Sequence, residues 1–343
     1  MDLLPSLECL GPLTHGRAPS LALDLMLGTR LIARGYANHT LKSRAQQLAE
    51  QHAAEWRARI DDPAAAAAAP LPRLREALAE LVEAERLGQP HAALALALRR
   101  AVEATPPADF LGFDALRGPP PDVRVGAGWR LWARALLHAY TAQRAGVAWH
   151  PAVGVADVLG WLPRLRAHYW APPPSLAAAS DGAAPAAPVS TLAEATRLAE
   201  QSYALTHVLL VLRDFAAPRV GAPLRALLAP ERDAMLAALP ALRAALGDAA
   251  LDVTAELVDA LKALGVADDA HPAVADASAF VRGARRADGS WGDGGLAYHT
   301  TIAALWALRD GEARWRWRGG GGEEARWGAE VGVAALGEVG QIS

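Results

Sequence analysis

The sequence alternates long stretches of strong helix formers with short groups of proline and glycine, and this pattern constrains the fold most. Alanine, leucine and arginine dominate the long stretches, and these residues favour the α-helix. Valine and isoleucine are sparse, and the strict alternation of apolar and polar residues that marks β-strands is missing. The pattern therefore predicts an all-α protein, with helices at 20–35, 40–60, 71–87, 90–104, 128–145, 155–169, 190–216, 222–229, 231–246, 249–264, 273–285 and 298–310.

Two segments depart from the helical pattern. Residues 171–190 are rich in proline, alanine, serine and glycine. This composition predicts a linker or mobile loop between an N-terminal helical half, 1–170, and a C-terminal half, 191–312. In residues 313–343 the run RWRWR is followed by four glycines, which predicts a flexible tail. The alternative is that the Arg/Trp run contacts nucleic acid or a membrane.

Charge and cysteine content narrow the possible partners. The net charge is -3 and the arginines form no stripe, so there is no electrostatic case for nucleic-acid binding. The single cysteine, Cys9, excludes a disulfide framework and a cysteine-rich zinc site, and it suits a reducing compartment. The N-terminus does not resemble a signal peptide, and no stretch of about 18 apolar residues is free of charge. We therefore expect a cytoplasmic protein without a transmembrane helix.

The stretch RADGSWGDGGLAYHTTIAALWAL, residues 286–308, predicts two helices joined by a tight turn. One helix ends near Arg285, and the next begins near Tyr298. The glycines of the turn allow the reversal, because glycine adopts backbone conformations that other residues avoid. Trp291 can bury a large indole over a turn that offers little else to pack. We therefore expect Trp291 to have a structural role rather than a catalytic one.

This turn resembles the QW-type repeat of the α/α-toroid enzymes, namely squalene–hopene cyclases, class II terpene cyclases and protein prenyltransferase β-subunits. In those families the turn joins an outer helix to the next inner helix. The resemblance implies an α/α-toroid of paired helices, complete or partial, with 273–310 as one repeat. With QSYALTHVLLVLRDFA (201–216) and LDVTAELVDALKALG (251–265), the stretch also resembles an uncharacterised family of actinobacterial proteins over roughly 190–310. That family suggests no activity.

The catalytic motifs of the terpenoid cyclases and prenyltransferases are incomplete here. VADD at 266–269 lacks the first carboxylate of the Asp-x-Asp-Asp motif of class II cyclases. The pair Asp61-Asp62 has no third acid, which the magnesium-binding motif of class I terpene synthases requires. Cys9 stands alone, whereas prenyltransferases and lanthionine cyclases bind zinc through cysteine. The resemblance therefore concerns the fold and not the activity.

Helix 190–216 carries a polar face beside its apolar stripe, formed by Glu200, Tyr203, His207 and Asp214. Their spacings of three, four and seven residues place them on one side of the helix. A histidine in so apolar a helix requires a partner. Tyr203 and Asp214 are the candidate partners, and hence the candidate catalytic groups, with Asp214 two turns away and therefore the poorer one.

A second acidic face and a second histidine complete a candidate metal site. Asp252, Glu256 and Asp259 share one face of the helix 249–264, and His299 begins the last predicted helix. In an α/α-toroid the N-termini of the inner helices gather at one end of a central cavity. The resemblance thus brings His207 and His299 together with Asp252 or Glu256. Two imidazoles and a carboxylate suit zinc, iron(II) or manganese.

Each of these residues also has a plain structural interpretation. His207 is equally consistent with a core histidine bonded to a backbone carbonyl, and His299 with a helix-terminal residue that binds no metal. Asp252, Glu256 and Asp259 are typical of the solvent face of an amphipathic helix.

Two function classes therefore stay open. The first is a metal-dependent enzyme of biosynthetic metabolism, a cyclase, lyase, hydrolase or oxygenase, acting on a small-molecule or peptide-like substrate in the central cavity. The alternative is a non-catalytic helical scaffold or binding module without metal.

Overall fold

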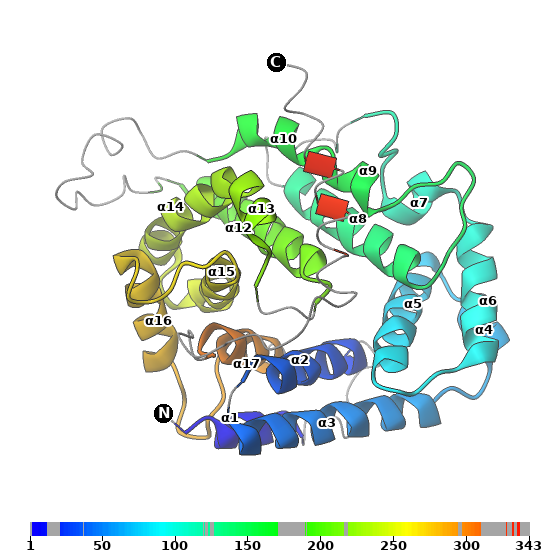
Figure 1. Cartoon of the computed structure of the whole chain (residues 1–343), viewed down its shortest axis with the longest axis horizontal. Helices are drawn as coiled ribbons and strands as arrows, with labels where there is room; N and C mark the ends of the chain where they lie inside the picture. The colour runs from blue at the N-terminus through cyan, green and yellow to red at the C-terminus, as the bar shows by residue number, and fades with distance from the viewer. Residues whose placement is uncertain are drawn as a thin grey trace.

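The computed structural model describes residues 2–11, 21–36, 38–118, 120, 123, 127–170, 189, 191–215, 219–293, 297–309, 327, 331–332 and 335–336. Within these residues all regular elements are helices and no strand occurs, which confirms the all-α class (Figure 1). The elements are α1 (Leu4–Glu8), α2 (Leu21–Gly35), α3 (His39–Ala58), α4 (Pro63–Ala67), α5 (Leu71–Arg86), α6 (Ala92–Glu103), α7 (Pro107–Leu111), α8 (Ala127–Arg144), α9 (Val155–Leu159), α10 (Leu162–Leu165), η3 (Arg166–His168), α12 (Leu192–Leu212), α13 (Ala222–Leu227), α14 (Ala229–Leu246), η4 (Gly247–Ala250), α15 (Leu251–Ala263), α16 (Pro272–Gly283) and α17 (Ala297–Ala307).

The predicted helices all have counterparts, with two kinds of difference. The predicted helix 155–169 is broken into α9, α10 and η3, since Gly160 follows α9 and Pro163 opens α10. The short helices α1, α4 and α7 were not predicted, and each carries a proline at its first or second position. Proline is tolerated there because the backbone N–H groups of the first helical turn have no acceptor within the helix. A proline can therefore mark the start of a helix as well as its interruption.

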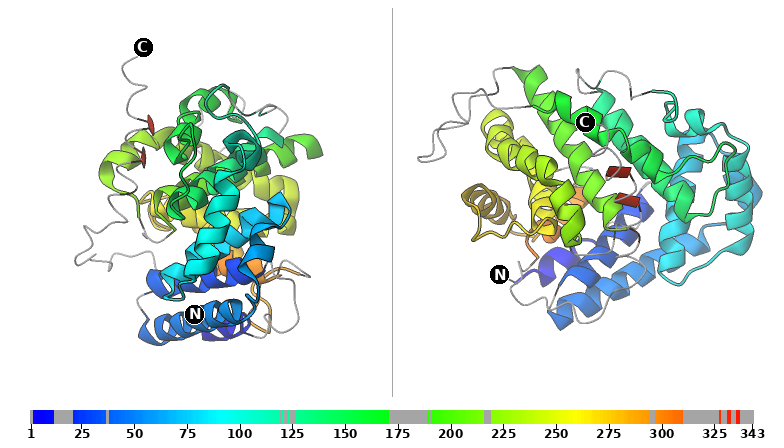
Figure 2. Two further views of the ribbon diagram at one scale, coloured as in Figure 1. Left: turned by 90° about the vertical axis from the view of Figure 1, so that its right-hand side faces the viewer. Right: turned by 45° about the horizontal axis from the view of Figure 1, so that its top comes forward.

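Six helices contact one another in a closed order: α2, α5, α8, α12, α15 and α17, with α17 returning to α2 (Figure 1). The remaining long helices lie outside this ring and pack on its members. Helix α3 covers α2, α4 and α6 cover α5, α9 covers α8, and α14 and α16 cover α15 (Figure 2). Both predicted halves contribute to the ring, because α8 packs on α12 and α2 packs on α17.

At two contacts of the ring, paired hydrogen bonds show that the neighbouring helices run in the same direction. Near the start of α8, Arg130 Nε donates to Glu200 Oε2 of α12 at 2.7 Å, and near the end of α8, Tyr140 Oη donates to Asp214 Oδ1 at 2.8 Å. From the first contact to the second, the residue number increases on both helices, so α8 and α12 are parallel. Parallel neighbours bring the N-terminal ends of helices to one side of the ring and the C-terminal ends to the other.

The same test applies where the ring closes. Tyr298, at the start of α17, donates its hydroxyl hydrogen to Asp24 of α2 at 3.0 Å. Tyr36, just after α2, donates to the carbonyl of Leu305 near the end of α17. Helices α2 and α17 are therefore parallel as well.

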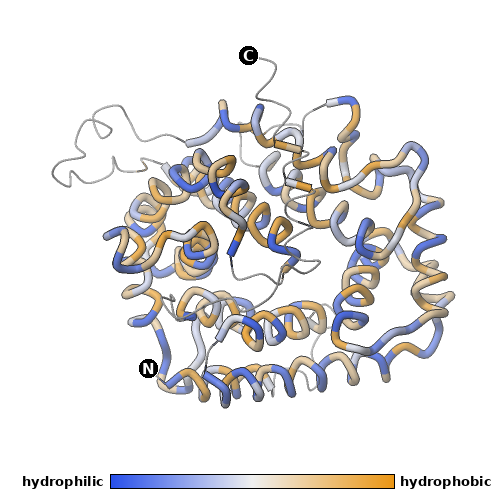
Figure 3. The backbone as a smooth tube through the Cα atoms, in the orientation of Figure 1, coloured by the Kyte–Doolittle hydropathy of each residue, from blue (hydrophilic) through white to orange (hydrophobic). Residues whose placement is uncertain are grey.

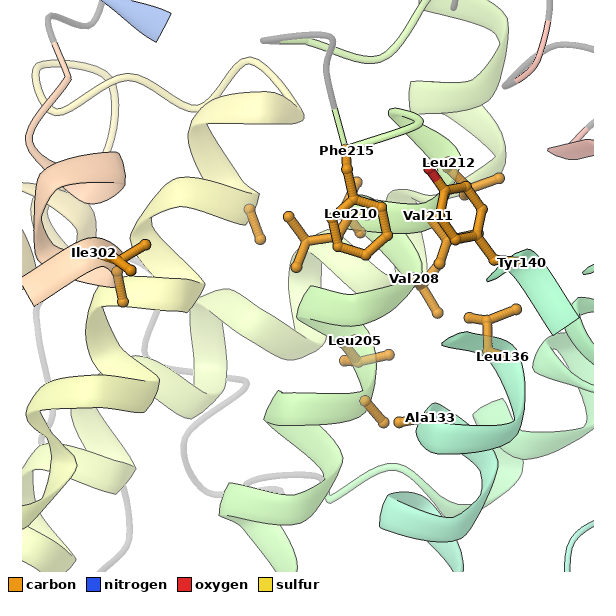
Figure 4. Packing of buried hydrophobic residues seen from close by; sticks show 14 of the residues in the cluster. Ala133, Leu136, Tyr140, Leu205, Val208, Leu210, Val211, Leu212, Phe215 and Ile302 are labelled. Atoms are coloured by element: carbon orange, nitrogen blue, oxygen red, sulfur yellow. The ribbon is translucent and has the colours of Figure 1, made fainter. Parts of the chain in front are cut away.

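Apolar side chains hold neighbouring helices together along their length. Ala133, Leu136 and Tyr140 on α8 face Leu205 and Val208 on α12 (Figure 4). Hydrophobic and hydrophilic residues are interleaved along the helices (Figure 3). This is the amphipathic pattern of helices that bury one face.

The turn between α16 and α17 matches its predicted structure. Trp291 is fully buried, and its Nε1–H donates to the Val281 carbonyl of α16 at 2.6 Å. Its backbone N–H donates to Thr301 Oγ1 of α17 at 3.0 Å. Gly289 has φ +91°, a left-handed conformation, and an added Cβ would lie 3.1 Å from the backbone of Pro5. Trp291 thus joins both helices to their turn.

The predicted flexible tail, 313–343, includes five residues that the structure describes. Trp327, Val331 and Leu336 are buried in the core. The Trp327 Nε1–H donates to the Val211 carbonyl at 3.0 Å, and its ring lies 3.8 Å from the Arg144 guanidinium. The other residues of 313–343 lie outside the described part of the chain.

Of the predicted linker 171–190, only Val189 is among the described residues. By length and composition alone, Ala229–Ala263 could cross a membrane. The structure divides this span into α14, η4 and α15, with Gly247 at φ +53° between them. Such a span is weak evidence for a membrane protein, because core helices of soluble proteins pass the same test.

Candidate functional site

Three of the four predicted metal ligands lie together where α15 packs on α17. Asp252 and Glu256 are one turn apart on α15, and His299 is the third residue of α17. His299 Nε2 lies 3.4 Å from Asp252 Oδ2 and 3.3 Å from Glu256 Oε1. One ligand atom from each residue lies within 4.8 Å of the others. We call these three residues the acid–histidine cluster.

The cluster is half-buried, and this sets the charge of its histidine. The Glu256 side chain is 6% exposed, whereas those of Asp252 and His299 are 41% and 35% exposed. Burial alone would lower the pKa of His299. Its hydrogen bonds to Asp252 and Glu256, and the charges of those carboxylates, outweigh burial and raise the pKa to about 11. The two carboxylates therefore favour the protonated form of the imidazole.

The remaining oxygens of the two acids differ. Thr206 of α12 donates its hydroxyl hydrogen to Glu256 Oε2 at 2.7 Å, which ties a third helix to the cluster. Asp252 Oδ1 is buried and accepts no hydrogen bond from any residue that the structure describes, even though the rest of its side chain is partly exposed. A buried carboxylate oxygen without a donor is uncommon and suggests a missing partner.

His207, the fourth predicted ligand, follows Thr206 on α12 but is not within the 4.8 Å group. Its Nδ1 lies 2.7 Å from the Tyr203 carbonyl, which can only accept, so Nδ1 carries the hydrogen. In the neutral ring Nε2 then holds a lone pair, and it has no hydrogen-bond partner among the described residues. Burial lowers the pKa of His207, while the charges of Glu256 and Asp252 act to raise it. His207 is therefore a core histidine bonded to a backbone carbonyl, and its Nε2 has no partner among the described residues.

Tyr203 partners His207 through its backbone and ring rather than through its hydroxyl. The two rings stack with centroids 3.9 Å apart, and the hydroxyl has no hydrogen-bond partner in the part of the chain that the structure describes. The spacing of four residues predicted the contact correctly.

Asp214 is not a partner of His207, contrary to the sequence prediction. Its carboxylate binds Arg86 and Arg144, each at 2.6 Å, and accepts from Tyr140 at 2.8 Å. Helix α12 ends at Leu212, and Asp214 adopts φ +53°, so its side chain leaves the face that it would share in a continuous helix. The error came from extending the helix to 216.

The acidic face of α15 is not a solvent face. Asp259 is 3% exposed and forms ion pairs with Arg213 and Arg309, both at 2.7 Å. Burial would raise the pKa of this carboxyl, but the two guanidinium groups lower it overall. Glu256 is buried too, and only Asp252 is partly exposed. The solvent interpretation fails for Asp259 and Glu256 because α15 packs against α12, α14, α16 and α17.

Sequence reasoning missed Asp24, which faces the cluster from α2. Asp24 Oδ2 accepts the hydroxyl hydrogen of Tyr298, the residue before His299, at 3.0 Å. Burial raises the pKa of the Asp24 carboxyl, although the charge of His299 and the Tyr298 hydrogen bond oppose this. A lone acid within the apolar run LALDLML was the available signal. No residue near Asp24 in the sequence indicated that it would contact α17.

No family model, no curated protein and no solved structure matches the chain. Any functional conclusion therefore rests on the geometry of the acid–histidine cluster and its neighbours.

Proposed function

We propose that the acid–histidine cluster binds a divalent cation, with Asp252, Glu256 and His299 as ligands and His207 as a further ligand through Nε2. The main support is that two carboxylates and an imidazole from two helices each place one ligand atom within 4.8 Å of the others. Two features support it independently. Among the described residues, Asp252 Oδ1 is buried without a donor, and the nearly buried His207 forms its hydrogen bonds through Nδ1 alone.

The donor set suits zinc, iron(II) or manganese, because imidazole nitrogen and carboxylate oxygen are their usual ligands. The supporting hydrogen bonds fit as well. A ligating histidine usually donates its other N–H to a carbonyl, as His207 does to Tyr203, and a ligating carboxylate is usually hydrogen-bonded, as Glu256 is by Thr206. A bound cation would supply Lewis-acid activation of a substrate carbonyl or water.

We propose further that the six-helix ring is the inner ring of an α/α-toroid. Its closed order of contacts and its parallel neighbours support this. The N-terminal ends of α2, α15 and α17 then place Asp24, Asp252 and His299 at one mouth of the ring. A small-molecule or peptide-like biosynthetic intermediate would react there, in a central cavity.

One observation favours the second candidate, a helical scaffold without metal. His299 already contacts both carboxylates, and their charges favour its protonated form. In that case the cluster is an ion-pair network that joins α15 to α17, and its role is to hold the ring closed.

Metal analysis separates the two candidates. The full chain, purified without a nickel column, is incubated with zinc, manganese or iron(II), desalted and analysed by mass spectrometry. We expect about one equivalent of a divalent metal per chain and a large loss of metal in His299→Ala and Glu256→Gln, with helicity unchanged by circular dichroism. Glu256→Gln keeps an oxygen that Thr206 can contact.

The exposed His39, at the start of α3, is the matched control, and His39→Ala should bind as the parent does. His207→Ala tests the further ligand separately, and it should reduce the affinity. A parent protein that retains no metal would overturn the proposal in favour of the scaffold, as would unchanged metal content in both His299→Ala and Glu256→Gln.

A further inference from the structure

The register of α8 and α12 places Arg134 and Tyr203 at the same level of the ring. The Arg130–Glu200 and Tyr140–Asp214 contacts set the register of these parallel helices. Arg134 lies one turn after Arg130, and Tyr203 lies nearly one turn after Glu200, so the two are neighbours at the next level of the ring. The charge of Arg134 also acts on the Tyr203 phenol, although burial and the charge of Glu256 dominate and raise the pKa of Tyr203.

Arg134 differs from the other arginines of α8 in having no counter-charge. Arg130 makes a bidentate contact with Glu200, and Arg144 is paired with Asp214. Arg134 is exposed, and it makes no hydrogen bond or ion pair with the residues that the structure describes. A guanidinium presents five donors in a planar fork that matches a carboxylate or a phosphate.

Tyr203 connects Arg134 to the acid–histidine cluster. Its ring lies against that of His207, and the charges of Glu256, Arg134, Arg130 and Asp24 all act on its hydroxyl. That hydroxyl has no partner among the described residues. The residue that contacts His207 thus carries an unpartnered hydroxyl, and the helix register places it at the level of Arg134.

We infer that the substrate is an anionic small molecule, and that Arg134 and the Tyr203 hydroxyl bind its carboxylate or phosphate group. This inference rests on the proposed function, since the cluster is the place where the bound molecule reacts. The anionic group lies against α8 and α12, and the remainder of the molecule extends toward Glu256 and His299. Arg134 acts as a positioning residue, because it holds the end of the substrate that does not react.

The test uses succinate and inorganic phosphate as separate probes, each titrated calorimetrically into the full chain. Both metal-free and manganese-loaded protein are used. We expect saturable binding in the millimolar range, weakened on the order of tenfold to a hundredfold by Arg134→Ala, because a charge-assisted bidentate contact is lost. Arg134→Lys should recover part of the affinity, since it restores charge without the planar fork. Tyr203→Phe should weaken binding less than Arg134→Ala.

Arg100→Ala is the matched control, because Arg100 is an exposed arginine near the end of the outer helix α6. It should leave binding and melting temperature unchanged, and Arg134→Ala should leave the melting temperature unchanged too. Equal affinity of parent and Arg134→Ala, or no saturable binding of either probe by the parent, overturns the inference.

The two probes identify the anionic group, since the tighter one names its class. Metal-free protein separates this result from the proposed function. If the chain binds no metal but Arg134→Ala still weakens anion binding, the metal site is wrong and the anion site stands. If metal binds and the Arg134 variants behave as the parent does, the metal site stands alone.

Discussion

Replacing Trp291 by alanine tests whether the turn before α17 holds that helix in place. The indole is fully buried and donates to the Val281 carbonyl at 2.6 Å. An indole buries up to about 250 Å², worth about 6 kcal/mol at ~25 cal/mol per Å², and alanine retains part of this. Measured losses for buried tryptophan to alanine are about 3–5 kcal/mol. The orphaned carbonyl adds about 1 kcal/mol.

We therefore expect Trp291→Ala to lower the free energy of unfolding by about 4–5 kcal/mol. Trp291→Phe keeps most of the apolar area but loses the hydrogen bond, and it should cost about 1–2 kcal/mol. Urea denaturation followed by circular dichroism measures both. Leu192, which is 77% exposed, supplies the control, and Leu192→Ala should stay within about 0.5 kcal/mol of the parent. A loss below about 1 kcal/mol for Trp291→Ala would refute a packing role for the tryptophan.

Three further outcomes follow from buried groups elsewhere. Burial raises the pKa of Glu80 to about 7, so the protein should lose stability as the pH rises from about 4.5 to 7. Glu80→Gln can still accept the hydrogen bond from Trp56, and it should raise the melting temperature at pH 8 but barely at pH 5. Equal shifts of the melting temperature at both pH values would contradict this. Asp259→Asn should cost about 3 kcal/mol or more in urea unfolding, because it removes the charge facing the buried Arg213, and a neutral result would count against that ion pair. Trp327→Ala should cost about 3 kcal/mol, whereas no change would return the C-terminal segment to the periphery.

Parallel packing in the ring also orders its charges. Acidic residues occur in first turns, at Asp24 of α2 and Asp252 of α15. Basic residues occur in last turns, at Arg34, Arg86, Arg144 and Lys262. This arrangement complements the helix dipoles, positive at the N-terminal end and negative at the C-terminal end. Carboxylates therefore gather on the same side of the ring as His299, whether or not a cation binds there.

The candidate site was predictable to the extent that it depends on helical spacing. Asp252 and Glu256 are four residues apart, which places them on one face of any helix, and His299 follows a turn whose glycines and tryptophan locate the helix start. Tyr203 and His207 are in contact for the same reason. Spacing cannot say what lies opposite a face, and for this reason Asp259 was assigned to solvent.

The sequence by itself determined that the chain is helical, where the long helices lie and which side chains share a helix face, because these depend on residues a few positions apart. Only the tertiary structure decided which faces meet. It turned Asp214 toward Arg86 and Arg144, brought Asp24 to Tyr298 across 274 positions, and buried Trp327 against α12. Such contacts depend on how separate helices pack, and ridges and charges along one helix are compatible with many partners until the whole core is assembled.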